Sequence, residues 1–353
     1  MSECMQLTIS LIIIDNSQNA SDFFRLSCIY DILLMIGSCS NKSTLSNLFK
    51  MKNHIVFLLL VLITTNCSDN DPGAKSTGTW KQLNDFPAEG RNASVTFSLL
   101  GKGYWGFGSN TSAGFLREIW SYEPSTDSWT QTNDFPFDLP AEAAVTANGK
   151  GYVIAYSGSL YDYTPGTDTW EYLTSCPVPG VNLVAFALGS DIFILKGGAK
   201  DFWKYSPSQD QWTQQKDFPG EGRLDAVSFV VADKGYVGLG FSGAGAPPIH
   251  KDLYRYDAVA NDWQQIADFP TNKAIVGMVF SNNTDAYVGI PFNDASHKGQ
   301  VFEYNVSSNS WREIKEFPSS NSLETRSFFI NDRMFVVGGW WSEISSQVWE
   351  FIP

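Results

Sequence analysis

The chain has 353 residues, a formal net charge of −13 at pH 7 and an aromatic content of 14%. Proteins that bind nucleic acid usually present a basic surface, so this charge disfavours a nucleic-acid partner. The five cysteines form neither a C-x-x-C pair nor a Cys/His spacing typical of zinc ligands, which excludes a disulfide framework or a structural zinc site as the basis of the fold.

Residues 51–66 are predicted to form a secretory signal peptide. Lys52 supplies a basic start, and the apolar run that follows, 55–63, is too short to span a bilayer. The segment ends at Cys67 and so resembles a bacterial lipoprotein signal, in which that cysteine becomes the lipidated N-terminus. The three residues before it, Thr-Thr-Asn, depart from the usual Leu-Ala-Gly-like sequence, so secretion without a lipid stays open.

This signal also sets expectations for the segments on either side of it. A signal peptide acts at an N-terminus, so we expect Met51 to be the true start and residues 1–50 to be a wrongly assigned upstream start; a genuine extra segment is the alternative. Residues 67–78 are polar and rich in turn formers, which predicts a lipid-anchored tether. We expect the protein at the outer membrane or cell surface, touching the membrane only through lipidated Cys67, with a periplasmic or secreted protein as the alternative.

The rest of the chain is organised by one repeated phrase, a tryptophan followed six residues later by Phe-Pro. Copies recur about every 40 to 50 residues, a period typical of propeller blades, because a unit this short must pack on its neighbours to bury its apolar face. In the third copy Cys176 replaces the phenylalanine, and we expect it to be a small buried apolar residue. The six copies begin at Trp80, Trp129, Trp170, Trp212, Trp263 and Trp311.

Each unit contains four segments that read as strands, separated by turn-forming residues. In the second unit these segments are 141–146, 152–156, 160–163 and 170–173. The last unit ends at Pro353 after three such segments, and the spare fourth is 79–83. We therefore predict that residues 79–353 form an all-β, six-bladed propeller closed by an N-terminal outer strand.

The residues after the second strand of some units resemble kelch repeats, which place Gly-Gly there and a tyrosine and a tryptophan further on. Gly-Gly pairs at 197–198 and 338–339 match, whereas 156–157 and 290–291 depart with Tyr-Ser and Ile-Pro. The resemblance covers about residues 79–353. It implies the propeller fold, but kelch domains serve many functions.

The two faces of the expected propeller differ in the length of their connections. Strands in a blade alternate in direction, so the connections after second and fourth strands share one face, here named the loop face, and those after first and third strands share the turn face. The loop-face connections are longer, and we expect recognition there. Trp340 and Trp341 lie in one of them and can stack on a sugar or anchor a protein; packing on the neighbouring blade is the alternative. Because the tether joins at the turn face, the loop face is expected to point away from the membrane.

Further candidates lie in the links into each first strand, beside the expected central channel. They carry charges of both signs, as a polar ligand pocket requires. In kelch repeats an arginine here often ties blades together, and that structural role is the alternative. The candidates are Glu89, Arg91, Glu142, Asn182, Glu221, Arg223, Lys273, Glu324 and Arg326.

Signals for catalysis are poor. His250 and His297 are the only histidines after residue 78; they lie on equivalent loop-face connections and are candidates for binding there, with Trp340 and Trp341. With Asp294 they could ligate a metal, but loop histidines are usually solvent-facing, and we predict neither a metal nor another cofactor. The chain has no G-x-S-x-G serine motif and no glycine loop that leads into a helix.

We therefore predict a monomeric, non-catalytic binding module that recognises a glycan or a protein at its loop face. The alternative is an enzyme, because the periplasmic N-acetylneuraminate epimerase family more distantly resembles this chain. That resemblance implies epimerase or mutarotase activity on a sialic-acid-like sugar, with Glu221 and Arg223 doing the acid/base and carboxylate-holding work. A structural spacer is a third possibility.

Overall fold

The chain falls into two compact units, Met1–Asn70 and Asp71–Pro353. In the first unit, β1 (Ser10–Ile12) pairs antiparallel with β2 (Leu58–Leu60). Apart from these two strands, the upstream segment, the expected signal peptide, Cys67 and the tether up to residue 77 lie outside the described residues. The structure, a computed structural model, describes residues 10–12, 58–60, 78–112, 114–138, 140–243, 249–271, 277–290, 299–314, 316–320, 323–340 and 343–352.

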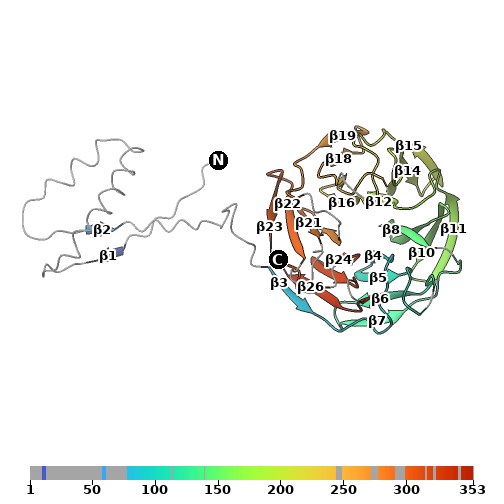
Figure 1. Cartoon of the computed structure of the whole chain (residues 1–353), viewed down its shortest axis with the longest axis horizontal. Coiled ribbons are helices and arrows are strands. Elements are labelled where there is room, and N and C mark those ends of the chain that lie inside the picture. Colours follow the sequence, from blue (N-terminus) through green and yellow to red (C-terminus); the bar gives the residue numbers. More distant parts are fainter. Residues whose placement is uncertain are drawn as a thin grey trace, which may run out of the picture. The chain divides into compact units, whose positions relative to one another are not determined.

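The described residues of the second unit form six four-stranded antiparallel sheets arranged around a ring (Figure 1). The described part of the chain contains no helix, and so none that is long and apolar enough to cross a membrane. Each sheet is one blade, and this part of the chain is an all-β, six-bladed propeller, which confirms the prediction from the repeat.

The first strand of each blade is the innermost one. Blade 1 consists of β4 (Val95–Leu99), β5 (Lys102–Gly106), β6 (Ile119–Glu123) and β7 (Ser128–Gln131); blade 2 of β8 (Ala141–Ala147), β9 (Lys150–Ala155), β10 (Ser159–Thr164) and β11 (Thr169–Ser175); and blade 3 of β12 (Val184–Leu188), β13 (Asp191–Leu195), β14 (Phe202–Ser206) and β15 (Gln211–Gln214). Blade 4 consists of β16 (Val227–Val231), β17 (Lys234–Gly238), β18 (Leu253–Asp257) and β19 (Asp262–Gln265); blade 5 of β20 (Met278–Ser281), β21 (Asp285–Ile290), β22 (Gln300–Asn305) and β23 (Ser310–Glu313); and blade 6 of β24 (Arg326–Ile330), β25 (Arg333–Val337), β26 (Val348–Ile352) and β3 (Thr79–Gln82).

The innermost strands of neighbouring blades lie beside one another around the ring, and β24 also contacts β4. Blade 6 takes its outer strand from the beginning of the repeat region, because β26 pairs antiparallel with β3 and Phe351 lies opposite Trp80. Phe317, from the phrase that ends blade 5, packs edge-on against Trp80 with the ring centroids 4.9 Å apart. The two ends of the repeat region thus share one sheet.

The repeated phrase packs each blade on the next through an aromatic pair. Phe135, at the end of blade 1, lies edge-on to Trp170 of blade 2, with centroids 5.1 Å apart. At the seam between blades 2 and 3, Cys176 takes the place of the phenylalanine. It is buried, and burial raises the pKa of its thiol to about 11, so it is the small neutral core residue expected from its position. The equivalent aromatic pairs are Phe86–Trp129, Phe218–Trp263, Phe269–Trp311 and Phe317–Trp80.

A polar contact also repeats from blade to blade. In blade 2 the Tyr163 hydroxyl donates to Asp168 Oδ1 at 2.7 Å, and Asp168 Oδ2 accepts the backbone N–H of Asn133, in the connection that leaves blade 1, at 3.0 Å. Asp168 has φ +54°, a conformation that Asp and Asn adopt more readily than other L-residues. This explains why Asp or Asn stands two residues before the tryptophan. The equivalent bonds are Tyr122–Asp127, Tyr205–Asp210, Tyr256–Asn261 and Tyr304–Asn309.

Candidate functional site

The loop face carries exposed apolar side chains on one half of the ring. Phe115, in the connection from β5 to β6, is 60% exposed, and Trp340, between β25 and β26, is 36% exposed. The backbone N–H of Trp340 donates to the Leu323 carbonyl oxygen at 2.9 Å, which fixes the chain beneath that ring. Trp341 lies outside the described residues. The exposed large apolar residues on loop-face connections of the described chain are Phe115, Phe137, Tyr156, Val181 and Trp340, which belong to blades 6, 1 and 2 and the link to blade 3.

Two of the expected channel-mouth carboxylates link neighbouring blades. Glu142 Oε2 accepts the backbone N–H of Asn182 at 3.0 Å, and Glu324 Oε2 accepts that of Ala93 at 3.1 Å. Both N–H groups belong to residues with positive φ, +58° at Asn182 and +48° at Ala93, at the start of the next blade. Burial raises the pKa of Glu142. These carboxylates therefore hold strained backbone at blade seams.

Charged groups of blades 4 and 6 also come together at the channel mouth. Arg326 is half-buried, its Nε donates to the Ser94 carbonyl oxygen at 2.6 Å, and burial lowers its pKa. Burial and the negative charge of Glu324 raise the pKa of Asp225, while Arg326 lowers it. Asp225 was not among the sequence candidates, although it occupies the same place in its link as Asn182, and shares its positive φ. Lys273 lies outside the described residues.

Arg91 and Arg223 are buried and engaged with partners inside the protein. The Arg223 guanidinium makes two hydrogen bonds to the Asp252 carboxylate, at 2.9 and 3.0 Å, and lies over the Phe218 ring at 4.9 Å. Arg91 contacts one carboxylate oxygen of Glu118 and lies over Phe86 at 4.8 Å, so Glu118 and Phe86 take the places of Asp252 and Phe218. Each arginine thus ties the phrase of one blade to the residue directly before the third strand of the next. Both guanidiniums are fully buried and bonded to protein groups, and the carboxylate-holding role considered for Arg223 stays a prediction.

A compact polar cluster lies beside Arg223 on the loop face of blade 4. Ser242 Oγ is 2.5 Å from His250 Nε2 and 3.3 Å from Glu221 Oε2, and His250 Nε2 is 3.9 Å from Glu221 Oε2. On the other side of the ring, His250 Nδ1 is 3.8 Å from Asp252 Oδ1. The structure therefore brings Glu221, Arg223 and His250 together, and adds Ser242 and Asp252, which the sequence analysis missed.

The environment of His250 differs from the expected solvent-facing loop position. Its side chain is only 11% exposed because it packs between Ser242 and Asp252. Burial and the positive charge of Arg223 lower its pKa and outweigh Asp252 and Glu221, which raise it. The imidazole is therefore neutral at pH 7 and can accept a proton.

The metal site considered for His250, His297 and Asp294 lies only partly within the described residues. His297 and Asp294 lie outside the described residues. Among the residues that are described, no group of three or more His, Cys, Asp or Glu side chains is arranged to hold a metal ion. Glu89 is described, and its Oε1 accepts the Ser112 hydroxyl at 2.9 Å.

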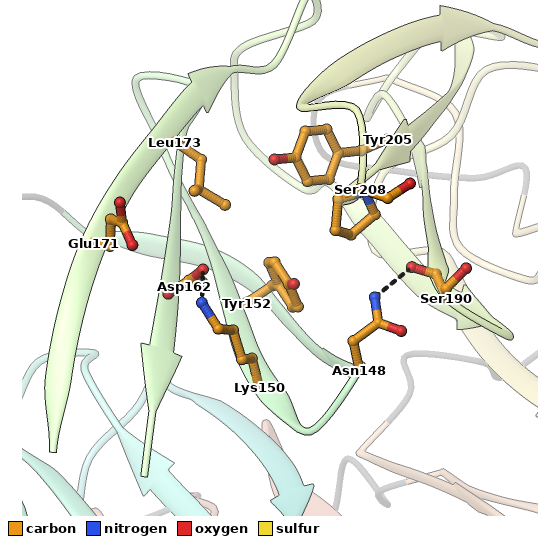
Figure 2. Close-up of a pocket in the computed structure, with 10 residues that line it drawn as sticks. Asn148, Lys150, Tyr152, Asp162, Glu171, Leu173, Ser190, Tyr205 and Ser208 are labelled. Carbon is orange, nitrogen blue, oxygen red and sulfur yellow. Dashed lines mark hydrogen bonds and ion pairs between the residues drawn. The ribbon is translucent and has the colours of Figure 1, made fainter. Parts of the chain in front are cut away.

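An open polar cleft of about 460 Å³ lies on the turn face between blades 2 and 3 (Figure 2). Lys150 Nζ is 2.7 Å from Asp162 Oδ2, and Asn148 Nδ2 donates to the Ser190 carbonyl oxygen at 3.1 Å. The charges of Lys150 and Asp162 neutralise each other, so the cleft offers Glu171 as its remaining charge. The lining is completed by Tyr152, Leu173, Tyr205, Pro207 and Ser208.

Known proteins share the repeat and the fold over part of their length. No family model matches the chain. It is 27% identical to Kelch-like protein 25 of Xenopus tropicalis over 169 residues, which are 44% of this chain and 28% of that protein. It is 24% identical to the Kelch repeat and BTB domain-containing protein 8 of Homo sapiens over 189 residues (49% and 30%), and 26% identical to N-acetylneuraminate epimerase of Yersinia enterocolitica over 175 residues (46% and 42%). The chain thus spans less than half the length of each of these relatives.

A solved structure supports the same architecture. The structure of YjhT superimposes with a TM-score of 0.62 at 14% sequence identity, covering 75% of this chain and 95% of the other. At this identity the likeness concerns the fold. The chain is thus a six-bladed β-propeller whose repeats are similar to those of kelch-repeat proteins.

Proposed function

We propose that this propeller is a binding module whose loop face receives a protein partner. The observation that carries the proposal is the group of exposed apolar side chains on loop-face connections of adjacent blades, Phe115 and Trp340 among them. Large aromatic side chains are the usual anchors of protein interfaces. Phe115 and Val181 offer apolar area without a hydrogen-bonding group, which suits a protein surface better than a sugar. The net charge of −13 favours a partner with a basic contact surface.

The N-terminal segment supports a place for this module in the cell envelope. We expect a monomer held at the membrane by lipidated Cys67, with the loop face available to an outside partner. Metabolic labelling with a radioactive fatty acid, compared between the chain and a Cys67→Ala variant, tests this placement. Equal labelling of the two, or none of either, contradicts it and leaves plain secretion.

The binding proposal is tested by substituting two exposed apolar residues on each of the two faces. Phe115→Ser with Trp340→Ser removes two loop-face anchors, whereas Leu100→Ser with Val259→Ser removes turn-face side chains, the latter 96% exposed. Proteins crosslinked to the full chain in cells that produce it are identified by mass spectrometry. We expect one partner to be recovered with the chain and the turn-face variant and lost, by about tenfold or more, with the loop-face variant. Equal recovery with both variants contradicts the proposal, and specific binding to a glycan array points to a sugar ligand instead.

A second candidate function is epimerisation or mutarotation of a sialic-acid-like sugar. It is favoured by the Ser242, His250 and Glu221 cluster, whose polar atoms lie within 2.5 to 3.9 Å of one another and can transfer protons to and from a sugar. One relative is an N-acetylneuraminate epimerase. Proton NMR of freshly dissolved N-acetylneuraminate measures the exchange between its anomers. A rate no faster with the chain than in buffer contradicts this candidate, and a faster rate should fall about 100-fold in Glu221→Gln.

A further inference from the structure

Blades 1 and 4 share the same arrangement of link, buried arginine pair and loop, so a residue that differs between them can be compared directly. In blade 4, the backbone N–H of His250 donates to the Gly240 carbonyl oxygen at 2.9 Å. In blade 1, the backbone N–H of Leu116 donates to the Gly108 carbonyl oxygen at 2.8 Å. His250 and Leu116 therefore occupy the same place. The other equivalent pairs are Glu221 with Glu89, Arg223 with Arg91, and Asp252 with Glu118.

Blade 1, which has the same arrangement but no histidine, shows what His250 adds to blade 4. Blade 1 also contains a serine beside its glutamate, since Ser112 Oγ donates to Glu89 Oε1 at 2.9 Å. It keeps the buried arginine and its carboxylate partner, and has leucine where blade 4 has His250. His250 is thus not required to build the link, the buried ion pair or the loop, and its contact with Ser242 calls for another role.

The contact between Ser242 and His250 is that of a nucleophile and its base. Ser242 Oγ lies 2.5 Å from Nε2, within hydrogen-bonding distance, and the neutral imidazole can accept the hydroxyl proton. Nδ1 faces Asp252 Oδ1 across 3.8 Å, and Asp252 is fixed by its two hydrogen bonds to Arg223. A carboxylate in this place stabilises an imidazolium, and such contacts often shorten when substrate binds.

The backbone conformation around Ser242 also supports its role as a nucleophile. Ser242 lies in Gly240-Phe-Ser-Gly-Ala, which differs from the G-x-S-x-G serine motif only in its last residue. Gly240 and Gly243 have φ of +80° and +76°, so the serine sits on a sharply turned segment between two glycines in the left-handed region. The turn here joins loop segments, whereas in the hydrolase motif it joins a strand to a helix.

We propose that Ser242 is a nucleophile with His250 as its general base, and that this site hydrolyses a neutral carboxylic ester. Ser242 Oγ bonds to the ester carbonyl carbon while its proton passes to His250 Nε2. The alcohol leaves as the carbon–oxygen bond breaks and takes that proton. Water, deprotonated by the same imidazole, then releases the acid and restores the serine. This activity is independent of a protein partner and requires no epimerisation.

The surroundings of the serine restrict the substrate. The Glu221 side chain is 73% exposed, and its Oε2 lies 3.3 Å from Ser242 Oγ, so a negative charge stands beside the nucleophile. An ester with an anionic acyl group is repelled there, whereas a neutral acyl group such as acetyl is not.

The experiment uses a fluorophosphonate probe and p-nitrophenyl acetate with the full chain. We expect the probe to label the chain at Ser242, as located by peptide mass spectrometry. His250→Leu, which reproduces the blade 1 arrangement, should slow labelling and hydrolysis about 100-fold or more, and Ser242→Ala should abolish both. Ser112→Ala is the matched control and should change neither. The rate should rise to a plateau with a midpoint below pH 6.5, since the pKa of His250 is lowered among Glu221, Arg223 and Asp252.

Each outcome bears on the proposal. Absence of labelling in a chain with an intact cooperative unfolding transition, beside a labelled serine hydrolase, overturns it, and so does an unchanged rate in His250→Leu. Hydrolysis of p-nitrophenyl succinate should be at least about tenfold slower than that of the acetate, and Glu221→Gln should narrow this difference. Equal rates for the two esters refute the proposed substrate class. The role of Ser242 as nucleophile is then decided by the labelling experiment alone.

Discussion

Replacing Arg223 by methionine distinguishes an arginine that holds blades together from one that is available to a ligand. The guanidinium makes two hydrogen bonds to Asp252, and its Nε donates to the Glu221 carbonyl oxygen at 3.0 Å. Methionine keeps apolar contact with Phe218 but leaves the Asp252 carboxylate, which is 22% exposed, without its counter-charge. Removing one partner of a buried pair costs about 3 to 5 kcal/mol, and the partial exposure of Asp252 places the expected loss near 3 kcal/mol.

Urea unfolding followed by tryptophan fluorescence measures this loss as a shift of the midpoint at constant slope. The control is Lys216→Met, because the ion pair of Lys216 with Asp262 is exposed on both sides and contributes little to stability. Arg223→Met combined with Asp252→Leu should recover a large part of the loss, since no unpaired charge remains. If Arg223→Met lowers the unfolding free energy by less than about 1 kcal/mol, no more than the control does, the structural role is refuted and Arg223 is again a candidate for ligand binding.

Three further predictions concern groups whose environment repeats or is unusual. Asp168→Ala should lower the unfolding free energy by about 2 to 4 kcal/mol, while Asp168→Asn should cost less than about 1 kcal/mol, because Asn261 makes the same contact in blade 4; equal losses in thermal unfolding contradict this. Although burial opposes it, the hydrogen bonds and charge of Arg223 lower the pKa of Asp252, so the stability from this pair is complete above about pH 4 and is lost as the pH falls through the lowered value. The unfolding free energy of Arg223→Met should lack this acid-sensitive part between pH 6 and pH 2.5, and parallel pH curves for the two proteins contradict it. With a thiol pKa of about 11, Cys176 should react with iodoacetamide at pH 8 only as fast as the protein unfolds, and rapid modification of the native chain, measured by peptide mass spectrometry, contradicts its burial.

The blades could be predicted because the contacts that build them repeat with the sequence. Phe135 and Trp170 meet at one seam, and the same two residue types meet at most of the others, so periodicity alone indicates which residues face a neighbour. Asp168 is predictable for a related reason, since a turn with positive φ limits which residues can stand before the tryptophan strand. Short-range pattern and long-range packing agree in these positions.

The cluster in blade 4 could be predicted only in part. The charged link pointed to Glu221, and the scarcity of histidine pointed to His250. Ser242 and His250 are eight residues apart and meet because the loop folds back, with the backbone N–H of His250 bonded to the Gly240 carbonyl oxygen. No periodicity encodes that contact, and the comparison of blade 4 with blade 1, in which Leu116 replaces the histidine, is the signal in the sequence that could have singled it out.

The kelch glycines show how a signature can be absent while its backbone conformation is kept. Gly338 and Gly339 follow β25 with φ of +69° and +98°, and in blades 1 and 4 the first of these places holds Phe107 and Leu239, with φ of +60° and +58°. A bulky residue in this region costs about 1 to 2 kcal/mol, but both side chains are fully buried, which contributes about 2 kcal/mol or more. The Leu239 carbonyl oxygen also accepts a hydrogen bond from Arg223 at 3.3 Å. Packing that glycine cannot provide thus offsets the strain, and these two departures from the signature occur in the two blades whose links carry a buried arginine. The departures therefore belong to the same framework that places the charged groups of blade 4 on the loop face.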